Sequence, residues 1–389
     1  MPFWANVPPN GKTAKRYTGD KNMSCVLFNE YPTQDGKKIV EIQLNAERTL
    51  NALTLEMIDL IQPKLDSWKD DDSVVAVLFD SAGEKAFCAG GDVVNLYKSM
   101  TGDADPDFPT DFFTREYILD YSIHTYPKPI ICWGHGIVMG GGMGLMNGCS
   151  HRVVTERTHM AMPEVTIGLY PDVGGSWFLN HMPGRTGLFL GLTGNPMNAA
   201  DALFLGLADR FIASDRRADL VEKLQSEQWD GCAYGATNRV LRQLESESQA
   251  AFNPDSPVQN HYRFIQQITD TDSLSDLVEG LMAVESDDKW ISRAKKAISH
   301  GSPLAVHLIK KQLEVTQHMS LKEVFESELV LSVQSCKHRE FPEGVRALLV
   351  DKDGAPQWTY KTVQEVDPAF VDQFFVAPWA VNPLATLSA

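Results

Sequence analysis

The segment MPEVTIGLYPDVGGSWF, residues 162–178, carries two acids in a mostly apolar stretch of sequence. Glu164 and Asp172 each directly follow a proline, and two glycines come shortly after the second acid. Burying a carboxylate costs free energy unless the group is paired or hydrogen-bonded. We therefore treat both acids as candidates for chemistry. The structural alternative is that each acid caps the helix that follows it.

Two glycine-rich turns are the second chemical feature. AFCAGGDVVNLY spans residues 86–97, GHGIVMGGGMGLMNG spans residues 134–148, and each lies between an apolar run and a helix-like sequence. A glycine turn that opens a helix aims free backbone N–H groups at one point, with the positive end of the helix dipole behind them. Such a point suits a phosphate, or the oxyanion that forms when a carbonyl is attacked. The alternative is that these glycines only permit tight packing of strand on helix.

The glycine spacing excludes several familiar motifs. Neither turn contains the G-x-x-x-x-G-K-[ST] pattern or the dinucleotide pattern G-x-G-x-x-G, and the chain has no G-x-S-x-G elbow. A purely structural role would be a reasonable interpretation of one glycine turn alone. It is less favoured here, because the chain has two such turns and two paired acids.

The surrounding elements must bring these groups together. The hydrophobic patterns predict a hairpin from residues 24–31 and 37–45, a helix over 54–68, and strands over 74–80, 129–138 and 151–156. Each glycine turn follows one of these strands. From residue 214 onward the patterns are helical, so the chain is predicted to be an α/β core followed by a long helical section.

Composition limits the classes of function. The 389 residues carry a net charge of −16, which argues against nucleic-acid binding and against a basic membrane-binding surface. No apolar run is long enough to span a membrane. The six cysteines form no C-x-x-C pair, as is typical of buried thiols in a reducing compartment. We expect a cytoplasmic enzyme with a loose tail over residues 1–23.

Four stretches together resemble the crotonase (enoyl-CoA hydratase/isomerase) superfamily. They are LNALTLEMI, AFCAGGD, HGIVMGGGMGL and AMPEVTIGLYPDVGGSWFL, in the order of the family and at about its spacing. Within the superfamily the chain is most similar to the branch that hydrolyses 3-hydroxyisobutyryl-CoA in valine breakdown. The resemblance implies a ββα spiral core over residues 24–213 and a helical region over 214–389 that closes the site.

The resemblance also implies which groups bind the thioester. Members of the superfamily hold the thioester carbonyl with two backbone N–H groups, one from each glycine turn, and the matching positions here are Gly91 and Gly141. The hydrolase branch has a substrate-contacting glutamate in the helix before the second turn. Its match is Glu116, in FTREYIL.

The same resemblance assigns the two acids. Enoyl-CoA hydratases use two glutamates, but at the position of the first this chain has Gly144. The hydrolase branch instead pairs the glutamate of the PE turn with the aspartate of PDVGG, here Glu164 and Asp172. We expect Glu164 to attack the carbonyl or to activate a water that does, and Asp172 to manage the proton and orient the substrate.

The expected activity is hydrolysis of a short 3-hydroxyacyl-CoA thioester. A hydratase or isomerase acting on a short enoyl-CoA, and a non-catalytic acyl-CoA binder, are the alternatives. No metal or redox cofactor is implied, since coenzyme A is part of the substrate. Superfamily members often form trimers or pairs of trimers, which makes a homo-oligomer an option, and a eukaryotic member would act in the mitochondrial matrix.

Overall fold

The computed structural model describes residues 24–229 and 231–387, so the tail expected over residues 1–23 lies outside the described residues. Strands occupy the first part of this range. In chain order they are β1 (Val26–Pro32), β2 (Lys38–Leu44), β3 (Val74–Ser81), β4 (Ala86–Cys88), β5 (Ile130–Gly134), β6 (Ile137–Met139), β7 (His151–Val154), β8 (His159–Ala161) and β9 (Arg210–Phe211).

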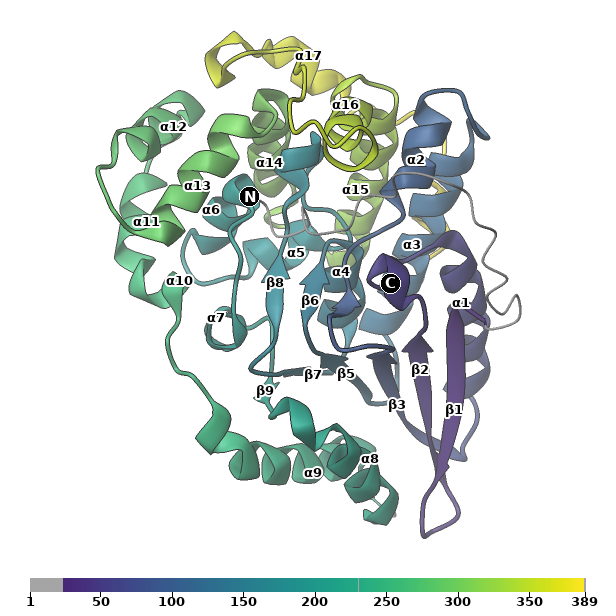
Figure 1. Cartoon of the computed structure of the whole chain (residues 1–389). Helices are drawn as coiled ribbons and strands as arrows, with labels where there is room; N and C mark the ends of the chain where they lie inside the picture. The colour runs from purple at the N-terminus through teal and green to yellow at the C-terminus, as the bar shows by residue number, and fades with distance from the viewer. Residues whose placement is uncertain (1–23, 230, 388–389) are drawn as a thin grey trace, which may run out of the picture.

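The strands form two sheets, one large and one small (Figure 1). The large sheet has the order β1-β2-β3-β5-β7-β9, with β1 and β2 paired as the predicted antiparallel hairpin and the other neighbours parallel. The small sheet pairs β4, β6 and β8 in parallel. The predicted α/β class is confirmed.

The single strand predicted over residues 129–138 is wrong. The strand is interrupted near Gly136, so β5 lies in the large sheet and β6 lies in the small one. Gly136 has a φ of 61°, and a Cβ there would lie 2.3 Å from the backbone oxygen of Lys85. Only glycine permits this close crossing. The same crossing places the second glycine turn beside the first.

Helices of the core connect and cover the strands. The predicted helix over 54–68 is confirmed as α1, with the Thr54 hydroxyl accepting a hydrogen bond from the amide of Met57. The helices up to residue 205 are η2 (Glu47–Thr49), α1 (Leu55–Lys69), α2 (Val93–Met100), α3 (Phe108–His124), α4 (Gly141–Gly148), η3 (Glu164–Ile167), α5 (Gly175–Asn180), α6 (Thr186–Thr193) and α7 (Ala199–Leu205).

Beyond β9 the described chain is helical. In the ranges that the structure describes, no helix is long and apolar enough to cross a membrane. The main helices here are α8 (Arg217–Ser226), α9 (Ala233–Ser248), α10 (Pro257–Asn260), α11 (Tyr262–Ile268), α12 (Leu274–Ala283), α13 (Lys289–His300), α14 (Pro303–Thr316), α15 (Leu321–Cys336), α16 (Glu340–Val345), the π-helical turn η6 (Arg346–Val350) and α17 (Pro368–Gln373).

Two hydrophobic clusters hold these layers together. The smaller one joins one face of the large sheet, through residues such as Leu78 and Ile131, to α8 and α9, which lie below the sheet in Figure 1. The larger one continues from the other face of the sheet into α13–α16. Because residues before and after position 213 share this core, the helical section is packed directly onto the part of the fold that carries the glycine turns. The domain boundaries themselves stay a prediction.

Candidate active site

A cavity of about 540 Å³ lies where both glycine turns, η3 and α3 meet the end of the helical section. Its wall is mostly apolar, and Phe341, Leu348 and Leu349 of the helical section contribute to it. The site residues predicted from the sequence come together here, since they all line this cavity: Gly91, Glu116, Gly141, Glu164 and Asp172.

The two glycine positions leave a space next to two free amides. Gly141 is the first residue of α4, and Gly91 comes shortly before α2. A Cβ on Gly141 would lie 3.3 Å from the backbone nitrogen of Gly91 and 2.8 Å from Oε1 of Glu116. Among the described residues neither amide donates a hydrogen bond. The arrangement can therefore bind an oxygen that develops negative charge.

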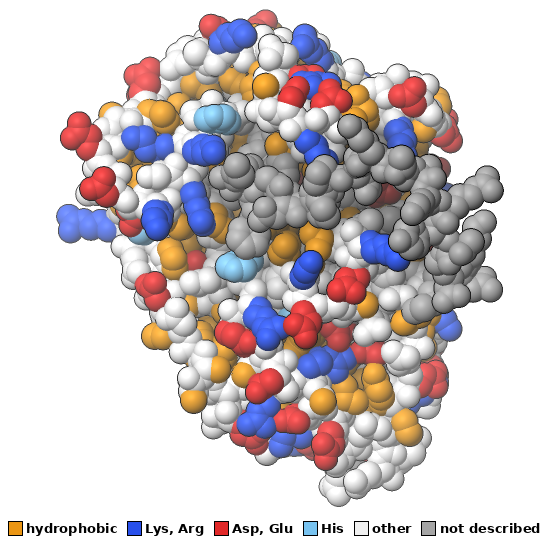
Figure 2. Space-filling view, in the orientation of Figure 1, with side chains coloured by type: hydrophobic (Ala, Val, Ile, Leu, Met, Phe, Trp, Pro, Cys, Tyr) orange, Lys and Arg blue, Asp and Glu red, His pale blue; other side chains and the backbone are white. Residues whose placement is uncertain are grey.

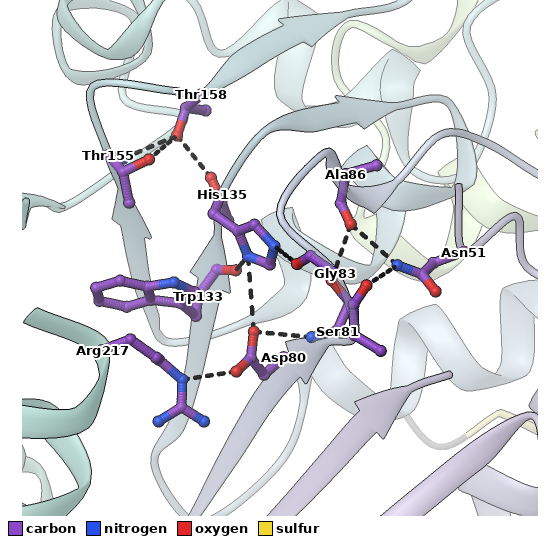
Figure 3. Close-up of polar contacts among 12 residues, drawn as sticks. Asn51, Asp80, Ser81, Gly83, Ala86, Trp133, His135, Thr155, Thr158 and Arg217 are labelled. Atoms are coloured by element: carbon purple, nitrogen blue, oxygen red, sulfur yellow. Dashed lines mark hydrogen bonds and ion pairs between the residues drawn. The ribbon is translucent and has the colours of Figure 1, made fainter. Parts of the chain in front are cut away.

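A polar network fixes the loops that lead into these turns (Figure 3). The side-chain amide of Asn51 donates to the backbone oxygens of Ala82 (2.9 Å) and Ala86 (3.0 Å), just before the first turn. Nε2 of His135 lies 2.9 Å from the oxygen of Gly83, which ties the second turn to the first. These contacts give His135 a structural role.

Buried charges support the same network from below. Arg217, at the start of α8, forms an ion pair with Glu41 on β2. It forms a second ion pair with Asp80 on β3, at 2.6 Å (Figure 3). Both carboxylates are almost fully buried, but each has the guanidinium as a partner. We call Glu41, Asp80 and Arg217 the charged frame.

The two acids of the opening motif are buried in a different setting. Glu164 begins η3 and its Oε2 accepts no hydrogen bond, while Asp172 accepts one at 2.7 Å from the Tyr117 hydroxyl. Neither carboxylate caps a helix. The amides of Gly174 and Ser176 at the start of α5 are instead taken by Glu328 of α15, at 2.7 and 2.8 Å. The capping alternative is therefore wrong for both acids.

Helix α3 adds two more buried carboxyl groups, one turn apart. Glu116 and Asp120 have exposed fractions of 2% and 0%, and neither Oε1 of Glu116 nor either oxygen of Asp120 has a hydrogen-bond partner. The sequence predicted Glu116 but not Asp120. We call Glu116, Asp120, Glu164 and Asp172 the acid pocket.

Burial and mutual repulsion shift the protonation of the acid pocket. Burial, followed by repulsion from Asp172, raises the pKa of Glu116 and of Glu164 well above the ordinary value, and the pKa of Asp120 rises for the same reasons. Burial raises the pKa of Asp172 to about 6, against the opposing effect of the Tyr117 hydrogen bond. Between these pKa values the pocket carries its negative charge on Asp172 and protons on the other acids.

Acids on the surface, unlike those of the acid pocket, lie among basic side chains. Lys and Arg side chains are interspersed with Asp and Glu over the face drawn in Figure 2. Within the described ranges, no ion pair involves a member of the acid pocket, and no group of three or more His, Cys, Asp or Glu side chains is arranged to hold a metal ion. Unpaired acids that retain protons in a cavity are typical of acid–base sites.

The space beside Gly144 is already filled. A Cβ at this position would lie 2.6 Å from Cβ of Val173 and 2.9 Å from Oδ2 of Asp120. Val173 itself has a φ of 55°, a strained backbone conformation for a β-branched residue. A glutamate therefore does not fit at position 144 unless its neighbours move.

Several polar residues of the site escaped the sequence analysis. Tyr117 directly follows Glu116, while Glu328 and Ser332 are four residues apart on α15, where they interrupt a buried apolar stripe. Polar residues spaced by four within such a stripe were the available signal, because they point to the same buried face of a helix. The sequence contained no indication that this face meets Asp172.

Comparisons with known proteins agree with this geometry. A family model described as enoyl-CoA hydratase/isomerase matches residues 39–375. The chain is 38% identical over 337 residues to the mitochondrial 3-hydroxyisobutyryl-CoA hydrolase of Danio rerio, covering 86% of each chain. It is 34% identical over 334 residues to the protein of that name from Homo sapiens, covering 86% of this chain and 85% of the human one.

Solved structures give the same result. A carnitinyl-CoA dehydratase from Mycobacterium thermoresistibile superposes with a TM-score of 0.81 at 33% identity, covering 93% of this chain and 98% of that one. An enoyl-CoA hydratase from Rhodobacter sphaeroides superposes with a TM-score of 0.78 at 31% identity, covering 91% and 98%. The chain belongs to the enoyl-CoA hydratase/isomerase family, as its glycine turns and PE motif predicted.

Proposed function

We propose that this protein hydrolyses 3-hydroxyisobutyryl-CoA to 3-hydroxyisobutyrate and coenzyme A. The observation that supports this most strongly is the pair Glu164 and Asp172, which line one cavity with two free glycine amides and form no ion pair among the described residues. The relatives named 3-hydroxyisobutyryl-CoA hydrolase, which match most of the chain, support the choice of substrate.

The thioester carbonyl is placed with its oxygen at the amides of Gly91 and Gly141. Two backbone donors there stabilise the oxyanion of the tetrahedral intermediate, and each such donor contributes about 10²–10³ in rate. Glu116, kept protonated by burial, lies against this turn and can donate a hydrogen bond to the substrate. We assign that bond to the 3-hydroxyl group.

The acid pair then provides one charge and one proton. Asp172 is the charged member in the empty cavity and Glu164 the protonated one. We propose that substrate binding moves the proton from Glu164 to Asp172. Glu164, beside the glycine turn, then attacks the carbonyl carbon or takes a proton from the water that does.

The remaining steps close the cycle. In the water route, the hydroxide adds to the carbonyl carbon, the C–S bond breaks, and Asp172 gives its proton to the departing sulfur. The products are the free acid and the thiol of coenzyme A. Glu164 again holds a proton and Asp172 again holds the charge, so the site returns to its initial state.

A hydratase has less support from the structure. Water addition to an enoyl-CoA with two glutamates needs a carboxylate at position 144, and that space is filled by Val173 and Asp120. We propose, as further parts of the same function, that no metal or redox cofactor takes part and that the protein acts in the cytoplasm, or in the mitochondrial matrix of a eukaryote. We also propose that the protein forms a homo-oligomer.

The first experiment is a thiol-release assay with 3-hydroxyisobutyryl-CoA, run in parallel with loss of the conjugated-thioester absorbance of an enoyl-CoA. We expect thiol release by the parent protein and a loss of about 10²–10⁴ in kcat in Glu164→Ala and in Asp172→Asn, the range of acid–base contributions. Equilibrium binding of the substrate by each variant is measured alongside.

The alternatives give different results. A change in the enoyl signal without thiol release makes the protein a lyase or isomerase. Binding of acyl-CoA that survives both substitutions, with no turnover by the parent, makes it a non-catalytic binder. Either result rejects the hydrolase.

A further inference from the structure

Three buried hydroxyl groups join Asp172 to the helical section. The Tyr117 hydroxyl lies 2.7 Å from Oδ2 of Asp172 and 2.7 Å from Oγ of Ser332. Ser332 in turn lies 2.8 Å from the hydroxyl of Tyr170, which donates to the backbone oxygen of Glu328 at 2.7 Å. All three side chains are almost fully buried. We call Tyr117, Ser332 and Tyr170 the hydroxyl chain.

The number of protons in the hydroxyl chain determines which charge state of Asp172 it favours. It makes four oxygen–oxygen contacts, between Asp172 at one end and the Glu328 carbonyl at the other. Each hydroxyl carries one proton, so the chain alone supplies protons for only three of the four. The carbonyl can only accept. The missing proton can come only from Asp172 itself.

The two charge states of Asp172 therefore order the chain differently. With Asp172 ionised, Tyr117 donates to it and one contact further along the chain has no proton. With Asp172 protonated, all contacts can be filled in one direction, from Asp172 through Tyr117, Ser332 and Tyr170 to the carbonyl of Glu328. A filled chain of buried hydrogen bonds is more favourable than one with an empty contact.

We propose that Ser332 and Tyr170, linked to Asp172 through the Tyr117 hydroxyl, are positioning residues that hold the proton on Asp172 during hydrolysis. This inference rests on the proposed function, because the protonated form of Asp172 is the form that protonates the departing thiolate. The chain does not carry the proton away from the site, since its far end is a backbone carbonyl.

The titratable groups around Asp172 that lie outside the hydroxyl chain do not supply this effect. They disfavour the negative charge of Asp172 in general, but they provide no proton for a hydrogen bond of the hydroxyl chain. These groups are Glu116 and Asp120 of α3, Glu164 of η3, and Glu328 and Cys336 of α15. The two tyrosines of the hydroxyl chain, Tyr117 and Tyr170, also interact electrostatically with Asp172.

The proton count predicts opposite effects for two substitutions. Tyr117→Phe removes the side-chain donor that stabilises ionised Asp172, so the pKa of Asp172 rises. Ser332→Ala leaves protonated Asp172 and Tyr117 with one proton that has no acceptor, so the pKa of Asp172 falls. One hydrogen bond corresponds to a shift of about half to one pH unit in each case.

The test measures the protonated carboxyl of Asp172 by infrared difference spectroscopy over a pH series, in the full-length protein. The spectrum of Asp172→Asn identifies the band. Ser335→Ala is the matched control, because Ser335 is a buried serine of the same helix whose hydroxyl donates to its own helix, to the oxygen of Leu331 at 2.8 Å. Alanine suits a helix at least as well as serine, so both serine variants are expected to fold.

We expect the midpoint to rise in Tyr117→Phe, to fall in Ser332→Ala and to stay in place in Ser335→Ala. Shifts of the same sign in Tyr117→Phe and Ser332→Ala, or equal shifts in the two serine variants, overturn the proposed role of the hydroxyl chain. The infrared midpoint does not depend on hydrolysis. Absence of thiol release therefore rejects the proposed function, whereas an unmoved infrared midpoint rejects the chain.

Discussion

The charged frame and the acid pocket are both built from buried carboxylates, but only one of them contains a cation. Glu41 and Asp80 share Arg217, and this frame holds the strands that lead to the glycine turns. Glu116, Asp120, Glu164 and Asp172 lie on the other side of those turns without a positive partner among the described residues. A paired buried charge fixes a structure, whereas an unpaired one changes its protonation.

The two regions depend on each other. The frame and the network above it fix the loops before both glycine turns, which set the point where an oxyanion can bind. The acid pocket brings protons to that point. Substitutions can therefore separate the two roles, since the frame should affect stability and the pocket should affect chemistry.

Arg217→Met should give the largest change in stability. It leaves Glu41 and Asp80 buried without the guanidinium that pairs with both, and removal of one member of a buried ion pair typically costs about 3–5 kcal/mol. Urea unfolding measures this loss, and kcat per folded molecule should stay close to that of the parent. Arg216→Met is the control, because the neighbouring Arg216 pairs with Asp219 in a largely exposed position and should leave the unfolding midpoint almost unchanged.

Gly141→Ala should give the largest change in activity without loss of a charge. The new Cβ would lie in the space between Gly91 and Glu116, where we propose that the substrate oxygen binds. We expect kcat to fall by about 10²–10³, as for the loss of one oxyanion donor. A matched change at Gly206, where a Cβ meets nothing within 4 Å, tests the glycine effect alone, although its φ of 74° adds strain. Equal losses of activity in both variants would contradict an oxyanion role.

Gly144→Ala should be a stability defect of intermediate size. The added methyl group meets Val173 and Asp120, and overpacking of this kind typically costs about 1–3 kcal/mol. Unfolding in urea measures it. Gly144→Glu should unfold more readily still and gain no hydration of an enoyl-CoA. Gain of hydratase activity in that variant would show that the filled space is not what separates this chain from hydratases.

Another prediction concerns the pH dependence of stability. The pKa of Asp172 rises from 3.8 to about 6 on folding, so the unfolded chain loses a proton that the folded protein keeps. The unfolding free energy of the parent should therefore fall, relative to Asp172→Asn, as the pH increases from about 4 to about 6, and the difference should be constant above that window. Urea midpoints over a pH series measure it.

Asp209→Asn provides the contrast for a paired acid. Burial of Asp209 is outweighed by its hydrogen bonds to Arg152, so its pKa is lowered. Its contribution to stability should be present above the unfolded pKa of 3.8 and should be lost as the pH decreases through the lower folded value. The same sign for both aspartates would contradict the distinction between paired and unpaired acids.

Local sequence signals predicted the features that local chemistry decides. The glycine turns, the hairpin, the Thr54 cap and the acids of the PE and PDVGG motifs depend on nearby residues, so short patterns were sufficient. The small sheet was missed, because β4, β6 and β8 have only three residues each. Periodicity cannot identify such short strands.

Contacts between distant segments account for the rest of the site. Asp120 resembles any polar residue of an amphipathic helix until Gly144 is placed against it. Ser332 and Glu328 belong to a helix more than 150 positions from the residues they contact, at separations of 215 and 154. Which helix face meets which loop is decided by the packing of the whole molecule, and a single sequence does not contain that information in any short pattern.

The capping of α5 by Glu328 has a consequence for the synthesis of the chain. A growing polypeptide leaves the ribosome N-terminus first, so Gly174 and Ser176 emerge long before the carboxylate that binds their amides. Until α15 arrives, these amides can only bond to water, and the apolar residues around them stay uncovered. The order of translation therefore makes the candidate active site one of the last parts of this molecule to become native.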